Sequence, residues 1–322
     1  MRGVIMKCNV TAVCNVLVFA LAVIFFTGTG CQPVTDQNEA GGIKLDPALI
    51  NGVRAFEDVR KLVVITPRHS GSAGCIKAAE HLQKAMQPYT DSCDIDVFND
   101  KTRQGTIAFR NVVGILQGSG SDIIILGSHY DTKSGISDTF QGANDSGSSS
   151  GLLIELARVL HEQPPLPYSV IFAFFDGEEC MESYGKTDGL HGSRRLVQQL
   201  KETGKLENIK AMILLDMIGD RDLNVTIPRN VDKTLRRIAF DASRAAGIRP
   251  KFTLSKGAVL DDHVPFVDAG VPAINLIDFE FGSKSSLNDY WHTEEDNLDH
   301  ICPESLQSIG EVVVHMLNMI SD

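Results

Sequence analysis

The stretch VIFAFFDGEE, from Val170 to Glu179, decides the fold of this chain and points to its chemistry. Its first six residues are hydrophobic, and such a run is typical of a strand that is buried on both faces of a sheet. Two adjacent carboxylates, Glu178 and Glu179, end the stretch, although burying a charge is costly unless something compensates for it. Neighbouring side chains on an extended segment point in different directions. We therefore expect one carboxylate to face a cation and the other to move protons.

Similar hydrophobic runs occur elsewhere and predict strands of a parallel or mixed sheet: Asp122–Gly127, Ser169–Phe175, Ala211–Met217 and Val271–Ile277. Amphipathic segments predict helices at Ser72–Met86, Ser148–Glu162, Ser193–Thr203, Lys233–Ala246 and Pro303–Met319. An antiparallel strand pair is predicted at Asp94–Phe98 and Thr106–Leu116. This alternation predicts the α/β class: a three-layer α/β/α sandwich in which helices flank a central mixed, mostly parallel sheet.

Length and charge limit the function classes. The chain has 322 residues and a net charge of −11. We expect one catalytic domain over residues 46–322, because no internal repeat divides this part of the chain. The acidic balance and the lack of basic clusters argue against binding of nucleic acid.

The first residues predict export. Arg2 and Lys7 precede the apolar stretch Val16–Phe26, and small residues follow it, so residues 1–30 are typical of a secretory signal. Cys31 then resembles the lipidated cysteine of bacterial lipoproteins, which implies a lipid-anchored protein of the periplasm or cell surface. Gly28 stands where that pattern has an aliphatic residue, and a plain signal peptide with an incidental cysteine is the alternative. The segment Gln32–Gly42 is polar and contains glycine, so we expect a flexible tether over residues 31–45.

Four cysteines lie beyond the tether: Cys75, Cys93, Cys180 and Cys302. They lack the close paired spacing of a structural zinc site. An exported protein can form disulfides, but spacing does not give their connectivity, and buried free thiols are the alternative.

Charged side chains follow each predicted strand of the sheet. His129 follows the first strand, the Glu178–Glu179 pair the second, Asp216 closes the third, and His292 lies beyond the fourth. Because open α/β sheets bind ligands beyond the carboxyl ends of their strands, we expect these residues to form a single site.

The residue types suit zinc, which binds nitrogen and oxygen ligands and keeps one position open in a catalytic site. The candidate ligands are His129, Asp145, Glu179, Asp216 and His292. Each has another interpretation on its own; Asp145, for example, or the neighbouring Ser146 could cap the helix that follows. Their joint placement beside a Glu pair favours a metal centre.

These motifs, in this order, resemble the zinc-dependent aminopeptidase superfamily, which has a two-zinc aminopeptidase branch and a single-zinc glutaminyl cyclase branch. The resemblance runs from about Arg60 to the C-terminus. Several stretches are similar to the cyclase branch: PRHSGS (Pro67–Ser72), FFDGEE (Phe174–Glu179), GLHGSR (Gly189–Arg194), LLDMIG (Leu214–Gly219), DDHVPF (Asp261–Phe266) and WHT (Trp291–Thr293). The tryptophan before the final histidine is typical of cyclases.

The resemblance implies a glutaminyl-peptide cyclotransferase, which converts the N-terminal glutamine of a peptide or protein to pyroglutamate and releases ammonia. It implies one Zn²⁺ ion and assigns roles to eight residues; we also expect a monomer. Zinc would be held by Asp145, Glu179 and His292. Glu178 would be the general base and acid, Asp216 and Asp261 a hydrogen-bonded acid pair, and Trp291 and Tyr184 the walls of the substrate pocket.

The same residues leave two alternatives open. With a second zinc on His129 and Asp216, the protein would be an exported aminopeptidase that hydrolyses N-terminal residues. The second alternative is a lipid-tethered peptide-binding protein without catalytic activity, although the presence of Glu178 argues against it. The chain also departs from animal cyclases: Tyr184 replaces a tryptophan, Leu260 a glutamine, and Ser128 a cysteine that forms a disulfide there. Lys133 is either exposed or helps to place the loop or the zinc-side carboxylate.

Overall fold

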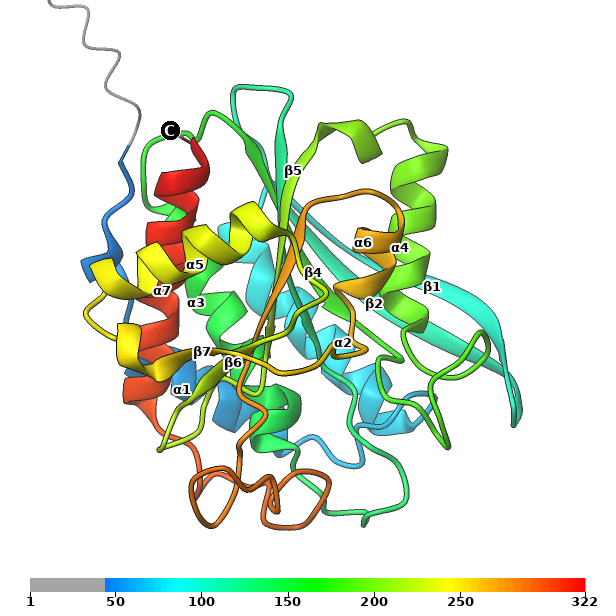
Figure 1. The fold of residues 1–322 in the computed structure, drawn as a ribbon. Helices are drawn as coiled ribbons and strands as arrows, with labels where there is room; N and C mark the ends of the chain where they lie inside the picture. Colours follow the sequence, from blue (N-terminus) through cyan, green and yellow to red (C-terminus); the bar gives the residue numbers. More distant parts are fainter. Residues whose placement is uncertain (1–43, 322) are drawn as a thin grey trace, which may run out of the picture. The chain divides into compact units, whose positions relative to one another are not determined.

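A six-stranded sheet runs through the centre of the domain (Figure 1). The computed structural model describes residues 44–321, which belong to one compact unit. The predicted signal segment, Cys31 and nearly all of the predicted tether lie outside the described residues. Within residues 44–321, no helix is long and apolar enough to cross a membrane.

The strands follow the order β1-β2-β4-β3-β5-β8. Their bounds are β1 Ser92–Thr102, β2 Gly105–Leu116, β3 Ile123–His129, β4 Ser169–Phe175, β5 Ile209–Asp216 and β8 Ala273–Ile277. Strands β4, β3, β5 and β8 are parallel to one another, whereas β2 pairs antiparallel with both β1 and β4. The predicted mixed, mostly parallel sheet is therefore confirmed.

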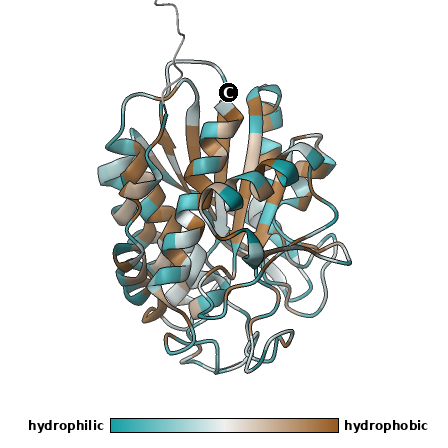
Figure 2. Ribbon diagram, turned by 60° about the vertical axis from the view of Figure 1, so that its left-hand side comes forward, coloured by the Kyte–Doolittle hydropathy of each residue, from teal (hydrophilic) through white to brown (hydrophobic). Residues whose placement is uncertain are grey.

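Helices cover both faces of the sheet, which confirms the three layers. Alternate side chains of each strand enter different cores: Leu126 and Phe172 pack in one, Ile125 and Ile171 in the other. The first core contains the helices α1 Gly52–Val63, α2 Ala73–Met86, α3 Ser149–His161, α5 Lys233–Ala245 and α7 Pro303–Ser321. The second contains α4 His191–Glu202 and α6 Val264–Asp268. In Figure 2 the central strands are mostly brown, while teal residues lie on the outer sides of the helices.

Some elements differ from the prediction. Strands β1 and β3 extend further than expected, and β8 begins two residues later. A separate parallel pair, β6 Val225–Ile227 and β7 Phe252–Leu254, was not predicted. Short 3-10 turns lie at Pro47–Leu49, Gln87–Tyr89, Leu206–Asn208 and Arg249–Lys251.

Helix α1 was also not predicted, although its sequence carries the signal. Ala55, Val59 and Leu62 recur at helical spacing and are buried, and the side chain of Asn51 caps the helix by accepting the N–H of Arg54. Helix α1 packs closely on α3: a Cβ atom at Gly151 would lie 2.4 Å from Cγ2 of Val59. Because α3 begins directly after the segment that carries Asp145, this packing fixes one side of the site.

The four cysteines of the domain are buried free thiols. The sequence left open either disulfides or buried free thiols, and the structure shows the second. The residues are Cys75, Cys93, Cys180 and Cys302.

Candidate active site and metal centre

The predicted site residues meet at the carboxyl edge of the sheet. His129 ends β3 and Asp216 ends β5. Glu178 and Glu179 follow β4, and His292 lies in the long segment between β8 and α7. Asp145 belongs to the irregular helical segment Ala143–Ser148, whose backbone is kinked at this residue.

One candidate metal group contains Asp145, Glu179 and His292, whose ligand atoms all lie within 4.8 Å of one another. Nε2 of His292 lies 2.9 Å from Oε1 of Glu179 and 3.3 Å from Oδ2 of Asp145. These are the three residues that the resemblance assigns to zinc.

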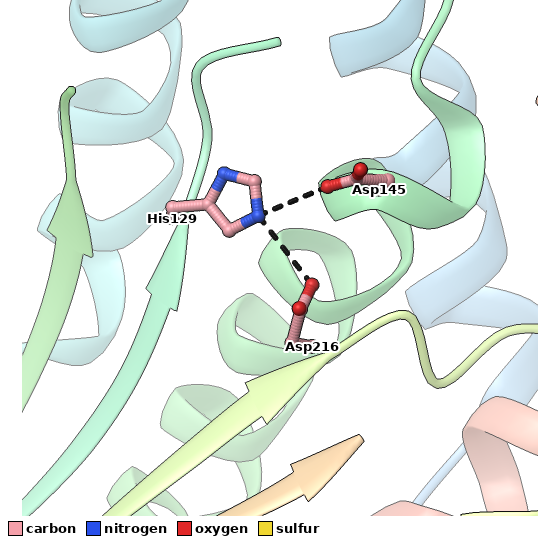
Figure 3. Close-up of side chains that lie close together, drawn as sticks. All are labelled: His129, Asp145 and Asp216. Atoms are coloured by element: carbon pink, nitrogen blue, oxygen red, sulfur yellow. Dashed lines mark ion pairs between the residues drawn. The ribbon is translucent and has the colours of Figure 1, made fainter. Parts of the chain in front are cut away.

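A second group shares Asp145 and adds His129 and Asp216. Figure 3 shows one ring nitrogen of His129 facing both carboxylates. Its Nε2 atom lies 3.1 Å from Oδ1 of Asp145 and 3.4 Å from Oδ1 of Asp216. Asp145 thus turns one oxygen to each group, which is the arrangement that a carboxylate bridging two metals requires.

The donor set fits a zinc ion. Three carboxylates and two imidazoles are gathered in a largely buried place, where unpaired charges are costly. Oε2 of Glu179 and Oδ1 of Asp216 are buried and accept no hydrogen bond within residues 44–321; their nearest basic groups are Lys133 at 3.6 Å and His129 at 3.4 Å. A cation bound beside these oxygens would compensate for the missing hydrogen bonds.

The pKa shifts of Asp145 and His292 also favour a cation site. Burial alone would raise the pKa of Asp145, but the hydrogen bonds of His129 and His292 outweigh it and hold the pKa below its usual value. Burial would lower the pKa of His292, but Asp145 and Glu179 raise it to about 9. The carboxylates therefore stabilise positive charge at this position.

Asp145 does not cap the helix that follows it, contrary to one sequence interpretation. Helix α3 begins at Ser149 without a side-chain cap, and the Asp145 carboxylate faces the two histidines. The backbone of this segment is instead held by Asp296, whose two carboxylate oxygens accept the N–H groups of Asn144 and Asp145 at 2.6 and 3.1 Å.

Asp131 holds the Glu pair in the same way. Its carboxylate accepts the backbone N–H groups of Glu178 and Glu179 at 3.2 and 3.3 Å. The hydroxyl of Ser70 lies between Asp131 and Asp176, 3.2 and 2.6 Å from their oxygens. Ser70, Asp131 and Asp176 therefore form a polar network that holds the loop after β4.

Arg68, from the PRHSGS motif, is fully buried beside this network. Its guanidinium donates to the carbonyl oxygens of Tyr130, Gln141 and Gly142 at 2.7, 2.9 and 3.0 Å. Burial lowers the pKa of Arg68 to about 10, so it stays charged at neutral pH. It ties the end of β3 to the segment before Asp145.

Glu178 lies beside the ligand group but outside it. Burial, with the nearby charges of Asp261 and Glu179, raises the pKa of this carboxyl well above its usual value, while His129 opposes the shift. A carboxyl with a raised pKa can both accept and return a proton near neutral pH.

The expected hydrogen bond between Asp216 and Asp261 is not present among the described residues. The oxygens of Asp261 accept from the amide of Asn275 and from the N–H of Asp262, both at 2.6 Å, whereas Asp216 lies against His129. Burial and the charge of Asp216 raise the pKa of Asp261 well above its usual value, so the two acids still influence each other.

A cavity of about 260 Å³ opens beside the ligands. Its apolar wall includes Trp291 and Tyr184, as predicted, together with Phe279 and Leu260. The ring of Trp291 stacks on His292 with 3.9 Å between ring centroids, and Phe279 lies 5.2 Å from Trp291. Such a pocket, with polar groups at its base, is typical of a small-molecule site.

Lys133 is partly buried rather than solvent-exposed. Its ammonium group donates to the carbonyl of Cys180 and lies 3.6 Å from Oε2 of Glu179, with 18% of the side chain exposed. This agrees with the second sequence interpretation, in which Lys133 helps to place the loop or the zinc-side carboxylate.

Sequence reasoning missed two residues of the site, Asp296 and Asn275. A signal existed for Asn275, which is a polar residue inside the apolar strand AINLI and would be costly to bury without a partner. Asp296 lies only four residues after His292, but four acidic residues occur in this region and no pattern separates it from Glu294, Glu295 and Asp299.

Comparison with known proteins agrees with this geometry. The family model described as Peptidase family M28 matches residues 111–317. The chain belongs to this family. It is 27% identical to a glutaminyl-peptide cyclotransferase from Drosophila melanogaster over 274 residues, which cover 76% of each protein.

Solved structures place the chain in the glutaminyl cyclase branch of M28. It is 35% identical to a glutaminyl cyclase from an Acidobacteriales bacterium, with a TM-score of 0.80 over 90% of this chain and 99% of the other. A Porphyromonas gingivalis glutaminyl cyclase is 28% identical, with a TM-score of 0.75 over 84% and 99%. The predicted family and branch are confirmed.

Proposed function

We propose that this M28 protein is a glutaminyl-peptide cyclotransferase, which converts the N-terminal glutamine of peptides or proteins to pyroglutamate and releases ammonia. The observation that carries the proposal is the position of Glu178. It lines one pocket together with the candidate ligands Asp145, Glu179 and His292 and with the aromatic side chains Tyr184 and Trp291.

Asp145, Glu179 and His292 would hold one Zn²⁺ ion, which when bound would supply a Lewis acid for the side-chain amide of glutamine. Glu178 would remove a proton from the α-amine of the substrate. The amine nitrogen then attacks the side-chain amide carbon, and Glu178 returns the proton to the departing ammonia. One C–N bond forms and one breaks, so no water is consumed.

The pocket walls favour cyclisation. Trp291 and Tyr184 enclose the substrate and exclude water, which would otherwise compete with the amine as nucleophile. Asp216 and Asp261, which line the same pocket, offer carboxyl groups that can orient the α-amine.

A specific observation supports a second candidate function. The His129–Asp145–Asp216 group could hold another zinc ion, and Glu178 would then serve an aminopeptidase that hydrolyses N-terminal residues. The aromatic wall of the pocket favours the cyclase over this alternative.

The deciding experiment offers the purified protein two dipeptides, one that begins with glutamine and one that begins with leucine. We expect ammonia from the first and no free leucine from the second. Release of leucine, with no ammonia from the glutamine peptide, would establish the aminopeptidase instead.

We also propose that the protein is exported, remains attached to the membrane through a lipid on Cys31, and acts there as a monomer on peptide N-termini. The support is the sequence of residues 1–31. Cell fractionation of the natural protein and of Cys31→Ala tests this, because the variant should leave the membrane fraction.

A further inference from the structure

The hydroxyl of Tyr184 donates a hydrogen bond to Oε1 of Glu178 at 2.8 Å. Within residues 44–321, it is the one hydrogen bond that this carboxylate accepts. Glu178 is only 5% exposed, so water cannot easily replace the bond. Burial and the charge of Glu178 raise the pKa of Tyr184 well above its usual value, so the hydroxyl keeps its proton and remains a donor.

The ring of Tyr184 is held in place by Gly189. A Cβ atom at Gly189 would lie 2.5 and 2.7 Å from Cδ1 and Cε1 of the ring, closer than any real contact allows. Gly189 also has a φ of +77°, which favours glycine. The ring therefore packs directly on the backbone at this residue.

The loop that carries Tyr184 is fixed by Asp188. Its carboxylate accepts the N–H groups of Met181, Glu182 and Ser183 at 2.6, 3.0 and 3.0 Å. The N–H of Leu190 then bonds the carbonyl of Glu178 at 3.1 Å. The loop thus leaves Glu178, turns, and returns to the same residue.

We propose that Tyr184 is a positioning residue for Glu178 as well as a wall of the pocket; the inference rests on the proposed function. With Oε1 bonded to the fixed hydroxyl, Oε2 is the oxygen left to accept the α-amine proton. The terminal torsion of a glutamate side chain is broad and roughly two-fold. Without the hydroxyl, the Glu178 carboxylate samples orientations in which neither oxygen faces the amine.

The test separates the hydroxyl from the ring. Tyr184→Phe keeps the ring on Gly189 and removes only the donor, so we expect kcat for the glutamine dipeptide to fall roughly tenfold, the scale of a hydrogen bond to a charged group, with KM changed less than about twofold. Tyr184→Leu also removes the wall, so KM should rise as well. Zinc content and the denaturation midpoint of the Phe variant should match those of the natural protein.

Tyr290→Phe is the matched control. Tyr290 lies next to Trp291 in sequence, and its hydroxyl makes no hydrogen bond within the described part of the chain, so kcat and KM should not change. A crystal structure of Tyr184→Phe gives a readout independent of activity: Glu178 should occupy more than one conformation.

Two results would overturn the inference. One is a Phe variant whose kcat equals that of the natural protein or in which only KM changes; the other is a single, unmoved Glu178 conformer in its crystal structure. Failure of the proposed function looks different, because the natural protein itself would release no ammonia. In that case the kcat comparison is made on leucine release, and the conformer test still applies.

Discussion

The carboxylate of Asp296 accepts a hydrogen bond from the backbone N–H of Asp145, at 3.1 Å. Its other oxygen accepts the N–H of Asn144 at 2.6 Å. Asp296 is fully buried. The segment around Asp145 is kinked, so these two bonds replace support that a regular helix would provide.

Asp296→Asn should therefore weaken zinc binding. The amide offers one acceptor where two N–H groups need one each, so Asp145 loses its fixed orientation. Partners that orient metal ligands typically change affinity by about 10- to 100-fold. Competition with a chelator measures this, and Asp299→Asn, on the exposed part of the same loop, is the control. Equal zinc affinity in both variants would show that Asp296 does not position the ligand.

Glu178→Gln tests the proton-transfer role. The change keeps the shape of the side chain and its contact with Tyr184 but removes the base, so kcat should fall by about 100-fold or more. Zinc content should stay the same, because Glu178 is outside the ligand group. Glu182→Gln, an exposed residue of the same loop, should keep full activity. Residual activity of Glu178→Gln within a few fold of the natural protein would assign the proton transfer to another group.

Much of this site could be predicted from the sequence because it follows from strand ends. A hydrophobic run that stops at an acid or a histidine indicates both the strand and the edge at which its ligand lies. Glu179, Asp216 and His129 are local to such runs. His292 lies far beyond its strand: the order of the strands made it a candidate ligand, and the motif resemblance assigned it to zinc.

The supporting contacts could not be predicted in the same way. Asp296 acts on a segment 151 residues earlier, and the bond between Tyr184 and Glu178 depends on a turn shaped by Gly189 and Asp188. The predicted pair of Asp216 and Asp261 failed for a similar reason: Asn275, on a neighbouring strand, takes one of the Asp261 oxygens.

Close packing of α1 on α3 makes Gly151 sensitive to substitution. A Cβ atom there would lie 2.4 Å from Cγ2 of Val59 and 2.7 Å from the carbonyl oxygen of Ala55, and the backbone atom cannot move aside. Gly151→Ala should lower the free energy of unfolding by about 2 kcal/mol. At Gly257 no atom lies within 4 Å of the corresponding position, so Gly257→Ala should change it by less than about 0.5 kcal/mol. Urea denaturation of both variants checks this; equal midpoints would contradict it.

His263 should make the fold sensitive to acid. It is fully buried without a hydrogen-bond partner in the described residues, and burial lowers its pKa from 6.5 to about 4. Above pH 6.5 the histidine is neutral in both the folded and the unfolded chain, so its titration does not change the free energy of unfolding. Between pH 6.5 and 4 only the unfolded chain binds the proton, so stability falls as the pH falls, by up to about 3 kcal/mol.

His263→Leu removes this titration. Its free energy of unfolding, measured from pH 7 to pH 4, should decline less steeply than that of the natural protein, whereas His161→Gln, on an exposed turn of α3, should follow the natural curve. Parallel curves for the natural protein and His263→Leu would mean that the histidine is protonated inside the fold.

The number of zinc ions decides between the two functions that this site can support. Both ligand groups share Asp145, but the proposed cyclase would need only the group with Glu179 and His292. We expect one zinc per chain, retained in His129→Ala and lost in His292→Ala. His129 would then act as a partner of Asp145 and Asp216 through its 3.1 and 3.4 Å contacts, and not as a ligand. Elemental analysis of the dialysed proteins measures this. Two zinc ions in the natural protein, with one lost in His129→Ala, would identify an aminopeptidase centre on the same scaffold.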